Sequence, residues 1–264
     1  GNYWALTGTA EPNSTVAIFE GSTQLAAVTA SASGSWSYVT TGSVTNSSIR
    51  TFTASASDAA GNSSAFLRAW IEGTAGNDTF AFASRANLVA PGEVDGNGGT
   101  DTISMTAPVT LGSGDFANVT SVETLQLTGA STVTLGADAA TAGIVNIVTG
   151  AGTTGITDTN GVALSVDATA LADNATLTLA GSAARTVTGL RGDLAASGVS
   201  GALNVTTVAV ASGLSIATGS GSNTITASAL TAGQTLTLTG GSTAAVTLNV
   251  GASSGNLAAG AEAD

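Results

Sequence analysis

Two copies of one short motif organise this chain: residues 73–80 read GTAGNDTF and residues 96–103 read GNGGTDTI. Each copy has Gly at its first and fourth positions, Asp at its sixth and a large apolar residue at its eighth. Glycine lets the backbone curl so that carbonyl oxygens point inward, and Asp supplies a hard anionic oxygen of the kind that calcium prefers. The motif therefore predicts a calcium turn followed by a short strand whose apolar residue faces a core.

The segment before the motifs, residues 1–71, is predicted to form a β-sandwich. Short runs of alternating polar and apolar residues recur between turn residues at spacings of roughly 8–12 residues, which is typical of an immunoglobulin-like fold. The predicted strands cover residues 15–19, 24–29, 34–39, 49–57 and 64–70.

Three blocks of this segment carry a more specific resemblance: LTGTAEPNSTV at residues 6–16, GSWSY at residues 34–38 and ASASDAAGNSS at residues 54–64. They resemble the bacterial Ig-like repeats of large surface adhesins. The resemblance implies a spacer or stalk domain, with Glu11 and Asp58 as weaker candidates for calcium ligands at a domain junction. The alternative, which we favour, is that Asp58 only caps its turn while Gly61 supplies a positive φ.

The two motifs lie in an acidic junction, residues 72–116, and resemble the RTX, or hemolysin-type, calcium-binding repeat. That resemblance implies that calcium is held between neighbouring turns by carboxylates and backbone carbonyls. The implied ligands are Asp78 and Asp101 and the carbonyls of Gly73, Ala75, Gly96 and Gly98, with Asp95 and Asn97 as additional candidates. Glu72 is a weaker candidate, like Glu11 and Asp58. The second position is not Gly in either copy, and the spacing of 23 residues departs from a tandem array. The alternative is a pair of Gly/Asp turns held by side chain to backbone hydrogen bonds.

The remainder, residues 117–264, contains no aromatic residue and consists mainly of Thr, Ala, Gly, Val, Leu and Ser. The run TLQLTGAS at residues 124–131 recurs as TLTLAGS at residues 176–182 and as TLTLTGGS at residues 235–242. Each run predicts a short strand with one buried face. Repetition of such strands between glycine turns predicts a parallel β-solenoid, with aliphatic side chains inside and Thr and Ser outside. A second, irregular β-sandwich is the alternative.

Two further stretches extend the resemblance over most of residues 73–264. The block DFANVTSVETLQLTG at residues 115–129 resembles a segment common in RTX-type bacterial surface and S-layer proteins. Residues 219–225, GSGSNTI, repeat the calcium motif with Asn223 in the place of Asp. An amide oxygen is a weaker calcium ligand than a carboxylate, so we expect this turn to persist without a high-affinity ion.

The composition limits the partners of the chain. Charged residues make up 8% of it, the formal net charge is −12, and the five basic residues are all Arg. So few cations argue against nucleic acid and against docking on anionic lipid. No stretch approaches the roughly 20 apolar residues of a membrane span. The sequence begins Gly1-Asn2-Tyr3 rather than with Met, so we expect a fragment, or the ordered part, of a longer protein. The resemblance to bacterial surface proteins implies that this protein is secreted to the cell surface.

Catalysis is not predicted. The chain has no His, Lys or Cys, so a serine triad, a Ser-Lys dyad or a thiol nucleophile cannot form. None of its glycine-rich stretches has the pattern of a phosphate-binding P-loop. Exposed Trp4, Trp36 or Trp70 could bind sugar, although a Trp in an Ig-like domain is more often part of the core.

Taken together, these patterns predict an all-β structural protein of the bacterial cell surface: an S-layer, surface filament or giant adhesin fragment that is stabilised and assembled with calcium. Its expected partners are copies of itself or neighbouring modules of a longer chain, with a surface glycan as a further candidate. Two alternatives remain open. One is a ligand- or carbohydrate-binding adhesin region, and the other is the C-terminal RTX module of a secreted enzyme.

Overall fold

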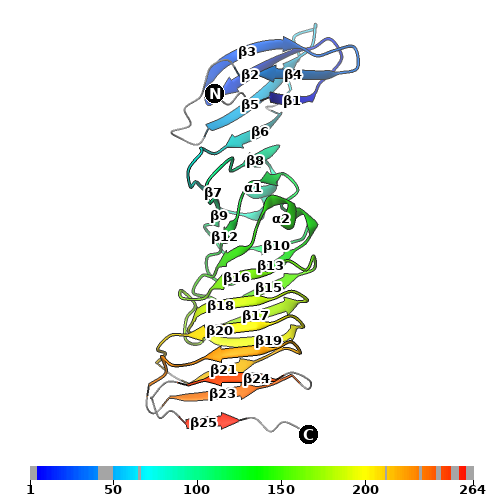
Figure 1. Cartoon of the computed structure of the whole chain (residues 1–264). Coiled ribbons are helices and arrows are strands. Elements are labelled where there is room, and N and C mark those ends of the chain that lie inside the picture. Colours follow the sequence, from blue (N-terminus) through cyan, green and yellow to red (C-terminus); the bar gives the residue numbers. More distant parts are fainter. Residues whose placement is uncertain are drawn as a thin grey trace. The chain divides into compact units, whose positions relative to one another are not determined.

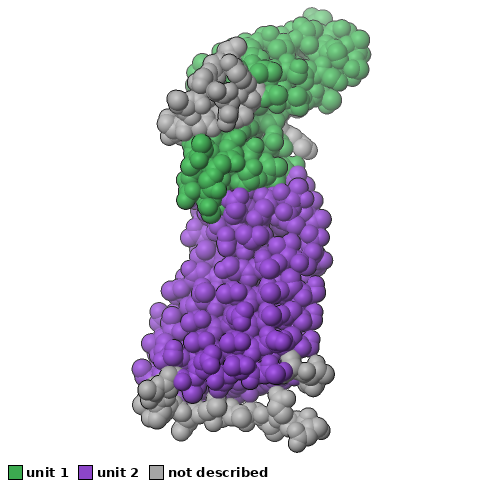
Figure 2. Space-filling view, viewed as in Figure 1, with its two compact units in different colours: residues 1–78, 86–101, 118–121 green, residues 79–85, 102–117, 122–264 purple. Residues whose placement is uncertain are grey.

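The structure is a computed structural model of the whole chain, and it describes residues 5–40, 50–64, 67–211, 213–231, 234–241, 245–250 and 256–259. The described chain is almost entirely β-structure, with two short helices, α1 (Arg85–Val89) and α2 (Ala137–Ala142), which confirms the all-β prediction. It divides into two compact units (Figure 2). Unit 1 comprises residues 1–78, 86–101 and 118–121, and unit 2 comprises residues 79–85, 102–117 and 122–264.

Unit 1 holds a two-stranded and a six-stranded sheet. In the smaller sheet, β1 (Ala5–Thr9) pairs antiparallel with β4 (Ser35–Val39). The larger sheet has the order β11-β8-β6-β5-β2-β3. Its strands are β2 (Thr15–Glu20), β3 (Thr23–Thr29), β5 (Arg50–Ser57), β6 (Leu67–Glu72), β8 (Glu93–Asp95) and β11 (Val119–Thr120).

The core of the sandwich in unit 1 follows from the alternation of its strands. In β2 and β5 every second residue is buried, and Ile18 and Phe52 are fully enclosed. Trp36 and Trp70 are also buried and meet edge to face, with ring centroids 5.8 Å apart and an interplanar angle of 82°. Edge-to-face contact is a preferred geometry of aromatic pairs, so these two residues belong to the core. Residue 49, residues 65–66 and Trp4 lie outside the described residues.

The larger sheet of unit 1 changes from antiparallel to parallel pairing at β6. Strand β6 pairs antiparallel with β5, where Phe52 stands opposite Trp70, and parallel with β8, where Ile71 stands beside Val94. Strand β8 in turn pairs parallel with β11, where Val94 stands beside Val119. The last strand of the sandwich is therefore also the first rung of a parallel ladder.

Unit 2 is a parallel β-solenoid whose strands stack rung upon rung in two sheets (Figure 1), and the whole solenoid has about eight turns. The nine-stranded sheet contains β7 (Thr79–Phe82), β9 (Thr102–Met105), β12 (Thr124–Gln126), β14 (Asn146–Val148), β16 (Leu164–Asp167), β18 (Arg185–Leu190), β20 (Leu203–Thr207), β22 (Asn223–Thr226) and β24 (Val246–Asn249). The eight-stranded sheet contains β10 (Thr110–Leu111), β13 (Ser131–Leu135), β15 (Thr154–Asp158), β17 (Thr176–Gly181), β19 (Asp193–Val199), β21 (Leu214–Ala217), β23 (Thr235–Thr239) and β25 (Asn256–Ala259).

A column of buried apolar side chains specifies the register of the nine-stranded sheet. Its members stand beside one another on successive rungs: Phe80, Ile103, Leu125, Ile147, Val166, Val187, Val205 and Ile225. Branched side chains pack well on a pleated surface, and a slip by one residue would turn each of them to the other face. This arrangement confirms the predicted solenoid rather than the irregular sandwich that was its alternative.

The repeated TLxL runs occupy two kinds of position in unit 2. The runs that begin at residues 176 and 235 form β17 and β23, which lie three rungs apart in the eight-stranded sheet. The run that begins at residue 124 forms β12 in the nine-stranded sheet. Either sheet accepts the run because both need the same alternation of inward aliphatic and outward polar side chains.

Candidate functional site

The two glycine turns for which the sequence predicts calcium lie directly over one another in unit 1. A Cβ atom added to Gly73 would lie 2.6 Å from the carbonyl oxygen of Gly96, and one added to Gly96 would overlap the carbonyl oxygen of Ser121. Gly98 lies over Ala75, with 3.7 Å between its Cβ position and the Ala75 carbonyl oxygen. Such close backbone approach requires Gly at positions 73 and 96. The structure therefore brings the two predicted motifs together.

The carboxylates of Asp78 and Asp101 bind backbone N–H groups of these turns. Asp78 accepts the N–H of Thr74 within its own turn. Asp101, which is 1% exposed, accepts the N–H of Asp78 at 2.7 Å and so links the second turn to the first. Asn77 strengthens the same link, because its Oδ1 accepts the N–H of Thr100 at 2.8 Å. Side chain to backbone hydrogen bonds of this kind are what the alternative interpretation of the motifs requires.

Asn97, at the second position of the second motif, also joins the two turns. It has a φ of 65°, a left-handed conformation that Asn tolerates better than most residues. Its N–H donates to Asp95 Oδ1 at 2.9 Å, and its Nδ2 donates to the carbonyl oxygen of Gly73 at 3.0 Å and to Glu72 Oε2 at 3.4 Å. The side-chain amide thus contacts one of the carbonyl oxygens that the RTX resemblance implies as a calcium ligand.

Negative charge gathers beside the stacked turns. Glu72 on β6 stands beside Asp95 on β8 and is only 4% exposed. Burial, and after it the carboxylates of Asp95 and Glu93, raise the pKa of Glu72 to about 7. Burial and the carboxylate of Asp95 also raise the pKa of Glu93. Like charges and desolvation both disfavour the ionised form of a carboxyl group, so a cation placed here would relieve a real electrostatic cost.

The residues of the stacked turns suit calcium in their chemistry. Calcium takes roughly six to eight oxygen ligands from carboxylates, carbonyls and water. Asp78 and Asp101 supply carboxylates from neighbouring turns, and the backbone at Ala75 and Gly98 runs alongside. Within the described residues, no three acidic, His or Cys side chains gather closely enough to hold a metal by themselves. Most of the ligands would therefore have to be backbone carbonyls or water molecules.

The two weaker candidates in the sandwich, Glu11 and Asp58, line a separate cavity of about 310 Å³. Asp58 Oδ1 accepts the N–H groups of Ala60 at 2.9 Å and Asn62 at 2.8 Å, and its Oδ2 accepts Nδ2–H of Asn62 at 2.7 Å. The hydrogen bond from the Asn62 side chain is the main cause that lowers the pKa of Asp58. With Gly61 at a φ of 85°, Asp58 caps its turn in the way we favoured from the sequence.

The degenerate copy of the motif forms a turn of different chemistry in unit 2. Asn223 is 2% exposed, and its Nδ2 donates to the carbonyl oxygens of Gly219 at 3.1 Å and of Gly221 at 2.7 Å. A Cβ atom added to Gly219 would overlap the carbonyl oxygen of Val199, so this turn is also stacked closely on its neighbour. The side-chain amide of Asn223 thus donates to two of the inward carbonyl oxygens of its turn.

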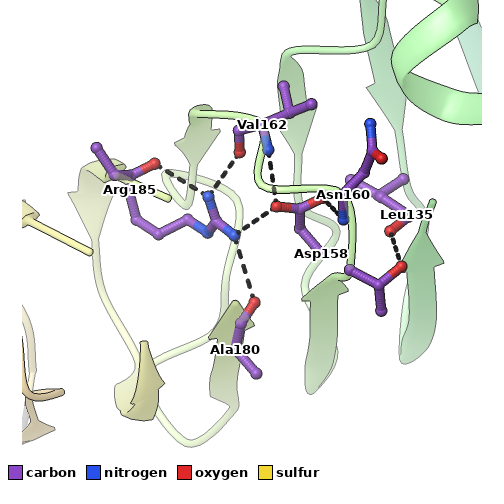
Figure 3. Close-up of polar contacts among 8 residues, drawn as sticks. Leu135, Asp158, Asn160, Val162, Ala180 and Arg185 are labelled. Carbon is purple, nitrogen blue, oxygen red and sulfur yellow. Dashed lines mark hydrogen bonds and ion pairs between the residues drawn. The ribbon is translucent and has the colours of Figure 1, made fainter. Parts of the chain in front are cut away.

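Unit 2 contains a buried ion pair that the sequence did not predict (Figure 3). Arg185 on β18 is fully buried, and its Nη2 lies 3.1 Å from Oδ2 of Asp158 at the end of β15. The guanidinium also donates to the carbonyl oxygens of Val162 at 2.8 Å and of Ala180 at 3.4 Å. Asp158 in turn accepts the N–H groups of Asn160 and Val162. One side chain thus ties together successive turns of the solenoid.

The sandwich of strands β1 to β6, with its core around two tryptophans, has the architecture that the N-terminal blocks predict. Residues 2–70 match the family model of the bacterial Ig domain. This Ig-like domain and the β-solenoid fit a bacterial surface protein, and domains of its kind are typical of extracellular surface proteins. No curated protein and no solved structure shows a match to the chain. In the described part of the chain, no helix is long and apolar enough to cross a membrane.

Proposed function

We propose that this chain is a load-bearing spacer of a bacterial surface protein, of the adhesin, surface filament or S-layer type, and that it acts without catalysis. The Ig-like domain and the β-solenoid support a surface or adhesin-type protein. The observation that favours a spacer is the six-stranded sheet of unit 1, in which β6 belongs both to the sandwich and to the parallel ladder. A shared sheet transmits load through its hydrogen bonds, whereas a flexible linker does not.

The shared sheet can be tested by loosening the Ig-like domain. The variant Ile18→Ala removes a fully buried side chain from β2 and should destabilise the domain by about 2–5 kcal/mol. Because β2, β5, β6 and β8 are neighbours in one sheet, the amide groups of β8 should then exchange hydrogen faster. Hydrogen exchange of the whole chain, followed by mass spectrometry, measures this.

The matched control for that experiment is Ile156→Ala in β15 of unit 2, where the same truncation creates a cavity in the solenoid. It should loosen neighbouring rungs of unit 2 and leave exchange in β8 unchanged. If β8 stays as protected in Ile18→Ala as in the unaltered chain, the sandwich and the ladder are not coupled and the spacer proposal fails.

Display at the cell surface needs a separate test. Antibody raised against the purified chain should label intact cells that make the full-length protein, and brief protease treatment of those cells should remove the label. A cytosolic marker protein serves as the control for cell integrity. Labelling that appears only after the cells are lysed would contradict the extracellular location.

The finer part of the proposal is that calcium stiffens the stacked glycine turns and promotes assembly. It is supported by the carboxylates of Asp78 and Asp101 on neighbouring turns and by the buried carboxyl group of Glu72, which the carboxylate of Asp95 repels. Electron microscopy and light scattering of the purified chain, with millimolar calcium and with chelator, test the assembly. Sheets or fibres that form only with calcium are the expected result, and particles of the same size in both conditions would contradict it.

A further inference from the structure

The sequence contains two Asn-Gly pairs, Asn97-Gly98 in unit 1 and Asn160-Gly161 in unit 2. A glycine that follows an asparagine leaves the asparagine side chain open to approach, because glycine has no Cβ atom and its backbone turns freely. The reacting groups of the two pairs are identical, so a difference in their reactivity has to come from the fold around them. The structure places the two pairs in opposite surroundings.

The first pair, Asn97-Gly98, is held at both of its reacting groups. The side-chain amide of Asn97 donates to the carbonyl oxygen of Gly73 at 3.0 Å and to Glu72 Oε2 at 3.4 Å. The N–H group of Gly98 donates to the carbonyl oxygen of Thr74 at 3.3 Å. Both residues of the pair are also half-buried. Attack of the Gly98 nitrogen on the Asn97 side chain therefore requires these hydrogen bonds to break first.

The second pair, Asn160-Gly161, is held at neither reacting group. Both residues are exposed and lie between β15 and β16, in a segment that belongs to no strand. The backbone N–H of Asn160 donates to Asp158. Among the described residues, however, neither the side-chain amide of Asn160 nor the N–H of Gly161 has a hydrogen-bond partner. Figure 3 shows that amide directed away from the carboxylate of Asp158.

We propose that Asn160 converts spontaneously to aspartate and isoaspartate in the folded chain, and that the fold protects Asn97 from the same reaction. The nitrogen of Gly161 bonds to Cγ of Asn160, the C–N bond of the side-chain amide breaks, and ammonia leaves with the proton of the glycine nitrogen. Water then opens the resulting succinimide ring at either of its carbonyl groups. The net reaction consumes a water molecule and releases ammonia, and it needs no enzyme, metal or oxidant.

The conversion acts on the buried ion pair of unit 2. Asp158 accepts the N–H groups of Asn160 and Val162, each at 3.0 Å, and its Oδ2 also lies 3.1 Å from Nη2 of Arg185. In isoaspartate the main chain runs through the former side chain, so the backbone between these two N–H groups becomes longer by a methylene group. The carboxylate of Asp158 then no longer reaches both, and the new carboxylate at position 160 repels it. A buried ion pair depends on good geometry and on its additional hydrogen bonds, so the reaction limits the lifetime of this corner.

Mass spectrometry of peptides from the whole chain, aged in mildly alkaline buffer with chelator, tests the proposal. Pepsin in acid stops the reaction and separates the two sites, whereas trypsin leaves both in one peptide, because residues 86–184 contain no Arg or Lys. Asn160 should convert at least about tenfold faster than Asn97, whose three surrounding hydrogen bonds have to break first. In denaturant the two rates should become similar. A ratio of rates that is the same in the folded and the denatured chain would overturn the proposal.

The variant Asn160→Gln tests the effect on the buried ion pair. It keeps an exposed amide but would have to close a larger ring, so it should not convert. Thermal unfolding is measured before and after ageing. The midpoint of the unaltered chain should fall by at least about 2 °C, whereas that of Asn160→Gln should not change. If the two chains change equally although mass spectrometry shows conversion of Asn160, the effect on the corner around Arg185 is overturned. The spacer proposal is tested separately, by hydrogen exchange in β8.

Discussion

The stacked glycine turns of unit 1 and the corner around Arg185 in unit 2 hold neighbouring turns together with opposite charge balances. In unit 1, Asp78 and Asp101 bind backbone N–H groups, and Glu72 adds a buried carboxyl group nearby. In unit 2, the carboxylate of Asp158 is paired with a fully buried guanidinium. The first arrangement accumulates negative charge, whereas the second contains its own counter-charge.

Because of this difference, the stability of one region depends on interactions within the chain, whereas the stability of the other depends on dissolved ions. A buried carboxylate that has an internal cation keeps its interactions at any calcium concentration, while clustered carboxyl groups are sensitive to protons and to dissolved cations. We therefore expect the stability of unit 1 to respond to pH and calcium, and that of the corner around Arg185 not to respond to calcium.

The largest expected effect comes from Arg185→Met, which leaves Asp158 buried without its partner. The free energy of unfolding should fall by about 3–5 kcal/mol. The control, Arg191→Met, breaks an ion pair with Asp173 in which the arginine is 44% exposed, and should cost about 0–1 kcal/mol. Urea unfolding followed by circular dichroism measures both. Similar losses in the two variants would show that the buried ion pair contributes no more to stability than the exposed one. The double variant Arg185→Met with Asp158→Leu should recover much of the loss, because it leaves no unpaired buried charge.

Calcium should raise the stability of the chain by about 2.7 kcal/mol when its concentration is a hundred times its Kd. Thermal unfolding with calcium, with magnesium and with chelator measures this gain. Asp101→Asn should abolish it, because that carboxylate links the two turns. Asp138→Asn, on α2 of unit 2, should retain it. A gain of the same size in Asp101→Asn would show that calcium acts elsewhere.

The variant Asn223→Asp tests whether the side-chain amide of Asn223 stabilises its turn as calcium is expected to stabilise the turns of unit 1. The carboxylate cannot donate to the carbonyl oxygens of Gly219 and Gly221, so the variant should lose about 2 kcal/mol in chelator. Millimolar calcium should restore part of that loss, making the turn resemble those of unit 1. Asn204→Asp on an exposed position of β20 is the control and should change little. If calcium does not reduce the loss of stability in Asn223→Asp, the turn of unit 2 cannot be converted into one that responds to calcium.

The smallest expected effect is the pH dependence of unit 1. Because the pKa of Glu72 is raised from 4.5 to about 7 in the folded chain, its favourable contribution is complete below pH 4.5 and is lost as pH rises to about 7. Glu72→Gln should flatten the stability profile between these pH values, whereas Glu11→Gln should not. If the stability of the unaltered chain does not change between these pH values, the pKa of Glu72 is not raised in the folded chain.

The sequence predicted those parts of the fold that depend on local pattern. Alternation in the TLTL runs is enough to indicate strands, and the apolar column from Phe80 to Ile225 follows from the same alternation. The blocks around Trp36 and Asp58 indicated the Ig-like domain, which the family match confirms. Calcium binding at Asp78 and Asp101 stays a prediction.

The features that the sequence did not reveal depend on contacts between distant positions. Asp158 and Arg185 are 27 residues apart, and only the height of one solenoid turn brings them into contact. The pairing of β6 with β8 was missed because the sequence of one strand does not show which strand pairs with its far edge.

The double role of β6 also bears on how such proteins can be recombined. A cut in the chain just after residue 72 would retain strands β1 to β6 but uncover the parallel edge of β6 that β8 now covers. An uncovered edge strand offers unpaired N–H and C=O groups to other chains and invites aggregation. If this Ig-like domain is transferred to another protein, residues 93–95 must be transferred with it so that the edge of β6 stays paired. The segment that has to be transferred is therefore longer than the domain that the family match covers.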